Sequence, residues 1–153
     1  IFLDAGSTTE QLATYLTEKD AVYVTNGITL AQKLAQRGLK TLLLAGRVKA
    51  TTDAVIGTEA VASLQHYHFS KGFFGTNGIT VEEGFTTPDI EEAMNKRVAM
   101  EHCRKCYVLA DASKFEALSN VSFGPLSKGV IITAAQEGLN VRSYKQHTEV
   151  IVL

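Results

Sequence analysis

The strongest constraint on the fold is a repeated alternation between short apolar runs and segments with helical spacing. Helical patterns begin at Ser7 and Asn26 and span residues 54–65. Apolar runs of strand length occupy residues 1–3, 21–25, 40–45, 71–76, 106–110 and 129–133. Three strand–helix units in succession predict an α/β fold, with a mostly parallel sheet and helices on both faces. Residues 141–144 and 149–152 add two late strands at the sheet edge.

Composition places the chain among ordinary globular domains. It has 153 residues, 45% of them hydrophobic and 20% charged, with a formal net charge of −1. There is no basic stripe, so we expect no DNA binding by this chain alone, and no apolar run long enough for a membrane span. Cys103 and Cys106 are too few for a disulfide framework, and with His102 too few for a zinc site. We expect a cytoplasmic protein with no metal and no cofactor.

The turn after the first strand has the features of an anion site. Asp4-Ala5-Gly6 breaks the strand, and Ser7 and Glu10 have capping-box spacing, so we expect Ser7 to cap the next helix. The hydroxyls of residues 7–9 then lie beside free backbone N–H groups at the positive end of a helix, which suits a phosphate. An ordinary capped turn would show the same pattern, and the turn matches neither a Walker loop nor G-x-G-x-x-G.

Polar clusters also follow the other strands. Because ligands bind at the carboxyl ends of parallel strands, we expect these clusters to meet at one rim. Each also has a local explanation, such as a helix cap at Asn26, a turn at Asn77-Gly78 or a solvated Lys114. The five clusters are Ser7–Thr9, Thr25-Asn26, Gly46-Arg47, Thr76-Asn77 and Asp111–Lys114.

The longest predicted helix begins at Thr87-Pro88, with Pro88 at its first helical position. Its expected buried stripe is Ile90, Ala93, Met94 and Val98. Glu92 and Lys96 lie on another side, four residues apart, where a surface ion pair is the simplest interpretation. Residues 47–52 are polar and basic and are predicted to be mobile, and residues 79–87 are polar and interrupted by glycine.

Several motifs together resemble the effector domain of DeoR-type bacterial transcription repressors. They are LDAGSTT, VTN, LLLAGR, FFGTNGIT, GFTTPDIEEAMNKR and LADASKF, from Ile1 to about Thr133. The resemblance implies a fold similar to ribose-5-phosphate isomerase and CoA transferases. It also implies that residues 1–153 are the sensor of a longer repressor. The chain begins in a strand without Met, so we expect the family's N-terminal winged helix-turn-helix to be absent from it.

The resemblance further implies the partners. The effector is a phosphorylated sugar, the protein is a homo-oligomer (a dimer or tetramer), and DNA is bound only through the N-terminal part. The GTNGIT and GFTTPD motifs are most similar to those of the fructose and lactose phosphotransferase-operon repressors of Gram-positive bacteria. This resemblance makes fructose 1-phosphate the first choice of effector and tagatose 6-phosphate the second. The sequence does not indicate whether the effector weakens or strengthens DNA binding.

By motif, the implied ligand site draws on every polar cluster and on the long helix. Gly6–Thr9 would hold the phosphate or a hydroxyl, and Lys114 would add positive charge. The full set is Asp4, Gly6, Ser7, Thr8, Thr9, Thr25, Asn26, Gly46, Arg47, Gly75, Thr76, Asn77, Gly78, Glu92, Lys96, Asp111 and Lys114.

Two other functions remain open from the sequence. A sugar-phosphate isomerase needs a general base, and the isomerases have roughly Gly-Ala-Asp-Glu after the fourth strand, where this chain has residues 75–78, GTNG. Both carboxylates are missing, and the lysine loop that follows is replaced by EEGF at residues 82–85. Glu92 and Asp111 remain. We therefore expect a binding module, not an enzyme; a purely structural oligomerisation domain is the third possibility.

Overall fold

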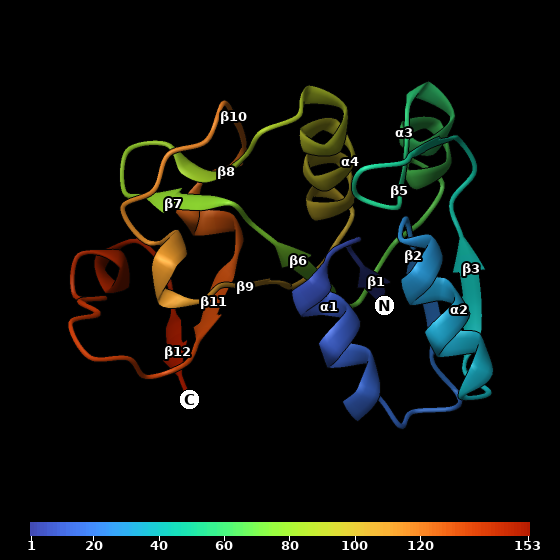
Figure 1. The fold of residues 1–153 in the computed structure, drawn as a ribbon, viewed down its shortest axis with the longest axis horizontal. Helices are drawn as coiled ribbons and strands as arrows, with labels where there is room; N and C mark the ends of the chain where they lie inside the picture. Colours follow the sequence, from blue (N-terminus) through green and yellow to red (C-terminus); the bar gives the residue numbers. More distant parts are fainter.

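The computed structural model describes all residues, 1–153, and its centre is a seven-stranded parallel sheet with helices on both faces (Figure 1). Every neighbouring pair of strands in this sheet is parallel. The predicted fold class is confirmed, and each strand falls in or beside an apolar run expected from the sequence. In spatial order the strands are β12 (Val150–Val152), β11 (Val130–Thr133), β9 (Cys106–Leu109), β6 (Gly72–Gly75), β1 (Phe2–Leu3), β2 (Val22–Thr25) and β3 (Lys40–Leu43).

Alternation along the strands divides the core between the two faces of the sheet. Phe2 joins one buried cluster and Leu3 joins the other. The Leu3 cluster packs against α1 (Ser7–Leu12), the 3-10 turn η1 (Ala13–Tyr15) and α2 (Ile28–Gln36). The Phe2 cluster packs against α3 (Thr58–Leu64) and α4 (Ile90–Glu101). Both faces of the central strands are therefore covered, as their apolar sequence requires.

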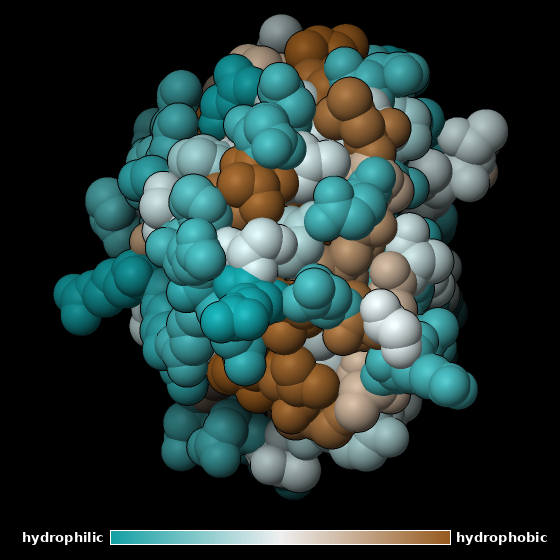
Figure 2. Space-filling model, turned by 90° about the vertical axis from the view of Figure 1, so that its left-hand side faces the viewer, coloured by the Kyte–Doolittle hydropathy of each residue, from teal (hydrophilic) through white to brown (hydrophobic).

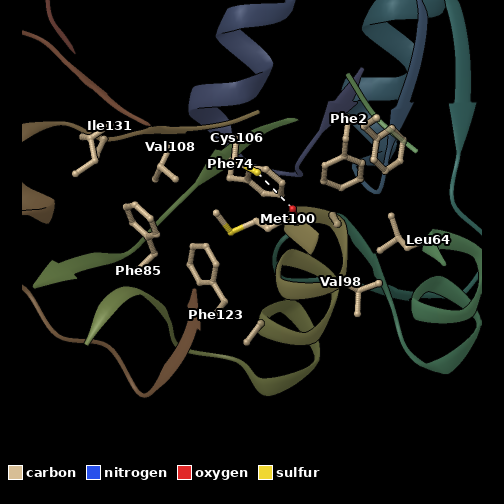
Figure 3. Close-up of a cluster of buried hydrophobic side chains, with 14 of the residues drawn as sticks. Phe2, Leu64, Phe74, Phe85, Val98, Met100, Cys106, Val108, Phe123 and Ile131 are labelled. Carbon is tan, nitrogen blue, oxygen red and sulfur yellow. Dashed lines mark hydrogen bonds between the residues drawn. The ribbon is translucent and has the colours of Figure 1, made fainter. Parts of the chain in front are cut away.

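Aromatic packing fixes the C-terminal end of α4 against the sheet. Met100 lies among Phe74, Phe85 and Phe123, with the rings of Phe85 and Phe123 6.0 Å apart between centroids (Figure 3). The Cys106 thiol at the start of β9 donates a hydrogen bond to the Met100 carbonyl at 3.5 Å. These contacts set the position of α4, whose other end forms part of the site described below.

Two small antiparallel sheets lie outside the main sheet. One is a hairpin of β4 (Arg47–Lys49) and β5 (Ala54–Ile56). The other contains β7 (Gly78–Thr80), β8 (Gly84–Thr87) and β10 (Val121–Gly124). The first hairpin places part of the polar stretch 47–52 in a strand and shows that the predicted helix start at residue 54 is wrong. All three residues of β5 are buried, and a short buried apolar run reads equally well as strand or helix.

The late strand predicted at residues 141–144 is also wrong. Tyr144 begins a 3-10 turn, η4 (Tyr144–Gln146), and its buried ring meets Phe115 edge-on with 5.0 Å between centroids. The Tyr144 hydroxyl donates to the Ile79 carbonyl at 3.0 Å. The apolar residues of this segment therefore pack on the small sheet and do not extend the large one. Two further 3-10 turns complete the elements, η2 (Ala112–Lys114) and η3 (Leu126–Lys128).

The face beyond the β12 edge of the sheet carries apolar side chains in groups separated by polar ones (Figure 2). The largest group lies low on this face, at the level of the C-terminus in Figure 1. Single exposed apolar residues are normal on a folded protein.

None of the helices combines the length and apolar character needed to cross a lipid bilayer.

Candidate functional site: a polar pocket at the switch point of the sheet

The strand order reverses between β1 and β6. From β1 the chain continues through β2 to β3 at one edge, and it then returns to β6 and proceeds through β9 and β11 to β12 at the other. Ligands of open parallel sheets bind at such a switch point, beyond the carboxyl ends of the strands. A pocket of about 310 Å³ lies there, lined by residues that follow β1, β2, β6 and β9 together with α4 and the β4–β5 hairpin.

The structure brings most of the predicted site residues to this one pocket. Thr8, Asn77 and Lys114, from three distant parts of the chain, all line it. The predicted residues found there are Asp4, Gly6, Ser7, Thr8, Thr9, Asn26, Gly75, Thr76, Asn77, Glu92, Lys96, Asp111 and Lys114.

Four predicted residues, Thr25, Gly46, Arg47 and Gly78, lie outside the lining. The buried Thr25 hydroxyl accepts a hydrogen bond from the Gly27 N–H at 3.0 Å and shapes the turn into α2. Gly46 (φ 146°) and Arg47 follow β3, the edge strand, where Arg47 pairs with Glu91 at 2.5 Å. Gly78 is packed so closely against the Ala117 carbonyl that no side chain fits. Four strand ends meet at the pocket, and the strand β3 is too far across the sheet to contribute.

The pocket also contains five residues that the sequence did not single out. Lys49 and Thr52 come from the β4–β5 hairpin, and Ala5, Ala54 and Pro88 complete the lining. Ala5 and Pro88 lie within the quoted motifs but carry no polar side chain that marks a site. Lys49, Thr52 and Ala54 are hidden because nothing in the polar stretch 47–52 shows that it folds back over the sheet.

The first turn of α1 presents two hydroxyls to the pocket, but not by the predicted capping box. Gly6, with φ 152°, occupies the cap position, and Ser7 is the first helical residue. Thr9 is buried and its hydroxyl donates to the Asp4 carbonyl at 2.6 Å, so it shapes the loop. Ser7 and Thr8 remain exposed. The helix begins one residue earlier than the capping box requires, so Glu10 is its fourth residue, and the Glu10 carboxylate pairs with Lys33 on α2 at 2.8 Å.

A buried ion pair forms the floor of the pocket. Lys96 donates to the Asp4 carboxylate and, at 3.1 Å, to the Gly75 carbonyl. Asp4 also accepts from the Gly75 N–H at 3.1 Å. Burial raises the pKa of Asp4, against the opposing effect of the Lys96 charge. The three groups join the ends of β1 and β6 to α4 and hold the floor rigid.

The burial of this ion pair shows that α4 is oriented differently from the prediction. Lys96 is only 5% exposed, whereas Ile90 and Met94 are 58% and 38% exposed. The buried stripe predicted for this helix is therefore wrong at Ile90 and Met94 and right at Ala93 and Val98. The interpretation of Glu92 and Lys96 as a surface pair is also wrong, because each has another partner.

Glu92 lies on the pocket wall, where the hairpin meets α4. Its Oε1 accepts from Lys49 at 3.0 Å and from the Thr52 hydroxyl at 2.8 Å. Asp89, and not Pro88, begins this helix as its cap, accepting from the Glu91 and Glu92 N–H groups at 2.9 and 3.0 Å. The Glu92 N–H and the Lys49 ammonium hold the pKa of Asp89 below its ordinary value, although burial opposes them.

Two amides and one lysine complete the wall. Asn26 does not cap α2, which Gly27 does; its Oδ1 accepts from the Ala5 N–H at 2.8 Å and holds the loop after β1. Asn77 is exposed, with its Oδ1 bound by the Thr87 hydroxyl at 3.2 Å. Lys114 has no carboxylate within 4.0 Å. Asp111 accepts from the Ser113 N–H at 2.8 Å, and its bonds to Ser113 lower its pKa despite partial burial.

These groups can do a specific kind of chemistry. Hydroxyls, amides and an unpaired ammonium can hydrogen-bond a hydroxylated anion from several sides. A general base is harder to find, since Asp4 is committed to Lys96 and Glu92 to Lys49 and Thr52. The third carboxylate of the lining, Asp111, has no lysine partner and is bound by the N–H and hydroxyl of Ser113. The pocket is equipped to hold such a molecule.

Comparison with known proteins agrees with the sequence motifs and the fold. Residues 1–134 match the family model described as the DeoR C-terminal sensor domain. The chain is 40% identical over its whole length to the uncharacterized HTH-type transcriptional regulator FruR of Bacillus subtilis, covering 61% of that protein. It is 32% identical over 99% of its length to the lactose phosphotransferase system repressor of Streptococcus mutans, again covering 61%.

A third relative is the HTH-type transcriptional regulator GlpR of Haloferax volcanii, which is 33% identical over 84% of this chain; the chain covers 51% of that protein. The chain thus spans between half and two thirds of the length of these relatives. The family match, the relatives and the parallel fold lead to one conclusion: the chain belongs to the family of DeoR C-terminal sensor domains.

Proposed function

We propose that this chain is the effector-sensing part of a transcriptional repressor of sugar-utilisation genes and that a phosphorylated sugar binds in the polar pocket. The observation that carries the proposal is the meeting of Thr8, Asn77 and Lys114 in one pocket at the switch point of the sheet. Lys114 supplies an ammonium with no carboxylate partner, which is the group that a phosphate dianion needs.

The names of two relatives support our choice of sugar. One is named for a lactose phosphotransferase system and another FruR. Fructose 1-phosphate is our first choice and tagatose 6-phosphate our second. The relatives named HTH-type extend beyond the region that this chain matches, and we place the DNA-reading part of the whole repressor there.

Binding would act on DNA through the arrangement of protomers. A ligand shifts a protein between two arrangements only if it binds one of them better, and coupling of about 1–3 kcal/mol is typical. Regulators that read paired half-sites are usually symmetric, so we propose a homodimer or homotetramer.

Thermal unfolding with paired ligands tests the proposal. Fructose 1-phosphate and tagatose 6-phosphate are each compared with the unphosphorylated sugar. A ligand at 100 times its dissociation constant stabilises the fold by about 2.7 kcal/mol. We expect stabilisation by at least one of the phosphorylated sugars and none by fructose or tagatose at equal concentration. The same melting temperature with all four would contradict the proposal.

A further inference from the structure

The charges that line the pocket already balance one another. Its three lysines are matched by three carboxylates, so the lining has no excess positive charge to attract a dianion. The six residues are Lys49, Lys96, Lys114, Asp4, Glu92 and Asp111. Of these lysines, Lys114 alone has no carboxylate partner, so under the proposed function a phosphorylated ligand gains a second ammonium only if one of the internal pairs gives up its carboxylate.

Lys96 is not the lysine that can exchange partners. Its side chain is 7% exposed and that of Asp4 is 3% exposed, and the Gly75 carbonyl takes a further hydrogen bond. Drawing Lys96 away to a ligand would leave the buried Asp4 carboxylate without its counter-ion, which is strongly destabilising. This pair is a fixed part of the floor.

Lys49 can exchange. Its side chain is 23% exposed and is shared between two carboxylates, Glu92 and Asp89, each at 3.0 Å. Lys49, Thr52 and Glu92 all line the pocket, whereas Asp89 does not. The Glu92 carboxylate thus accepts hydrogen bonds from an ammonium and a hydroxyl that could both bind a phosphate instead. If Glu92 releases Lys49, the ion pair with Asp89 still holds the Lys49 side chain at the pocket.

We propose that Glu92 is an internal competitor of the ligand: it occupies Lys49 and Thr52 until the phosphate of the ligand replaces it. A phosphate dianion has twice the charge of a carboxylate and more acceptor oxygens, so it is the stronger partner for an ammonium. This inference rests on the proposed function and adds Lys49 and Thr52 to the ligand-binding residues.

The exchange would also alter how the hairpin is held. Both bonds from the hairpin to Glu92 would be lost, while Arg47 keeps its pair with Glu91 and Lys49 its pair with Asp89. The base of the hairpin stays fixed by the Val55 N–H, which donates to the Asn26 carbonyl at 2.6 Å. Ligand binding would therefore change the contacts between the hairpin and the first turn of α4.

Two neutral variants of neighbouring glutamates test the inference. Glu92→Gln keeps an oxygen that can accept from Lys49 and Thr52 but removes the competing charge. Glu91→Gln is the matched control, since Glu91 is one residue away, pairs with Arg47 and does not line the pocket. Calorimetric titration of the purified protein with fructose 1-phosphate and with tagatose 6-phosphate gives the affinities.

We expect Glu92→Gln to bind the phosphorylated sugar about three- to tenfold more tightly than the wild type, and Glu91→Gln to bind it within about twofold. If Glu92 instead binds a sugar hydroxyl, its replacement weakens binding, and that result overturns the inference. An unchanged affinity in Glu92→Gln overturns it as well. Both of these outcomes leave the proposed function standing, because the wild type still binds.

A second pair of variants tests whether Lys49 binds the phosphate of the ligand. Lys49→Met should weaken binding of the phosphorylated sugar by about tenfold, whereas Arg47→Met, on the same strand but outside the pocket, should not. Equal affinities in Lys49→Met and the wild type overturn the inference. Failure of the wild type to bind either phosphorylated sugar overturns the proposed function, and this inference with it. Melting temperatures of all four variants show whether each is folded.

Discussion

Lys96 and Asp4 form an ion pair beneath the pocket although they lie far apart in the chain, and both side chains are almost fully buried. The pair joins α4 to the end of β1 through the floor of the site. Its burial makes it the most consequential charged contact of the protein for stability.

Replacing Lys96 by Met should therefore destabilise the fold by about 3–5 kcal/mol, because Asp4 is left buried without its counter-ion. Lys33→Met is the control, since the Lys33–Glu10 pair also joins two separate elements, with 2.8 Å between the charged atoms, but its side chains are 47% and 26% exposed. That change should cost less than about 1 kcal/mol. Urea unfolding measures both, and equal losses would contradict the assigned role of the buried pair.

The Asp89 cap predicts a loss of stability in acid. Its folded-state pKa lies below the unfolded value, so its stabilising contribution is present above the unfolded pKa and is lost as the pH falls through the folded pKa. Asp89→Ala should cost about 1 kcal/mol near neutral pH, and the difference from wild type should shrink below about pH 4. Urea unfolding at a series of pH values checks this, and a difference that persists unchanged in acid would contradict it.

A variant at Gly78 distinguishes a structural role of this residue from a role in ligand binding. A methyl group there would collide with the Ala117 carbonyl and the Thr86 hydroxyl, so Gly78→Ala should destabilise the fold by about 1–3 kcal/mol. Because Gly78 lies outside the pocket lining, the folded variant should bind a phosphorylated sugar as the wild type does. A weakened affinity in a folded Gly78→Ala would restore the role in the site that the motif implies.

The isomerase alternative predicts proton exchange, and the pocket predicts none. Asn77 cannot take a proton, Asp4 and Glu92 are held by lysines, and the Asp111 carboxylate is held by Ser113. Ribose 5-phosphate incubated with the protein in heavy water should therefore gain no deuterium at carbon 2 when followed by NMR. Incorporation that disappears in Glu92→Gln or Asp111→Asn would show that a catalytic base remains.

The sequence predicted the parallel sheet because each of its strands is a compact apolar run, such as residues 21–25. It predicted most of the pocket because strand ends converge at a switch point whatever the intervening loops do. It missed the burial of Lys96, since a lysine on an amphipathic helix is normally solvated. That burial depends on Asp4, and no local pattern shows a partner so far away.

The small antiparallel elements were harder to predict for a related reason. The hairpin residues Lys49 and Thr52 look like a polar loop until Glu92 and Asp89 are placed opposite them. Ser7 and Glu10 have capping-box spacing, but Gly6 takes the cap position and Ser7 becomes the first helical residue. The hairpin depends on a tertiary contact that no local pattern shows, whereas the predicted cap is misplaced by one residue.

The most direct test of the central claim is a calorimetric titration of the protein and of Lys114→Ala with fructose 1-phosphate, tagatose 6-phosphate and the two unphosphorylated sugars. Lys114 is the pocket lysine without a carboxylate partner. We predict saturable binding of at least one phosphorylated sugar by the wild type, about tenfold weaker binding by Lys114→Ala, and no binding of fructose or tagatose. No binding of either phosphate, or equal binding by the variant, would contradict the claim that this pocket senses a phosphorylated sugar.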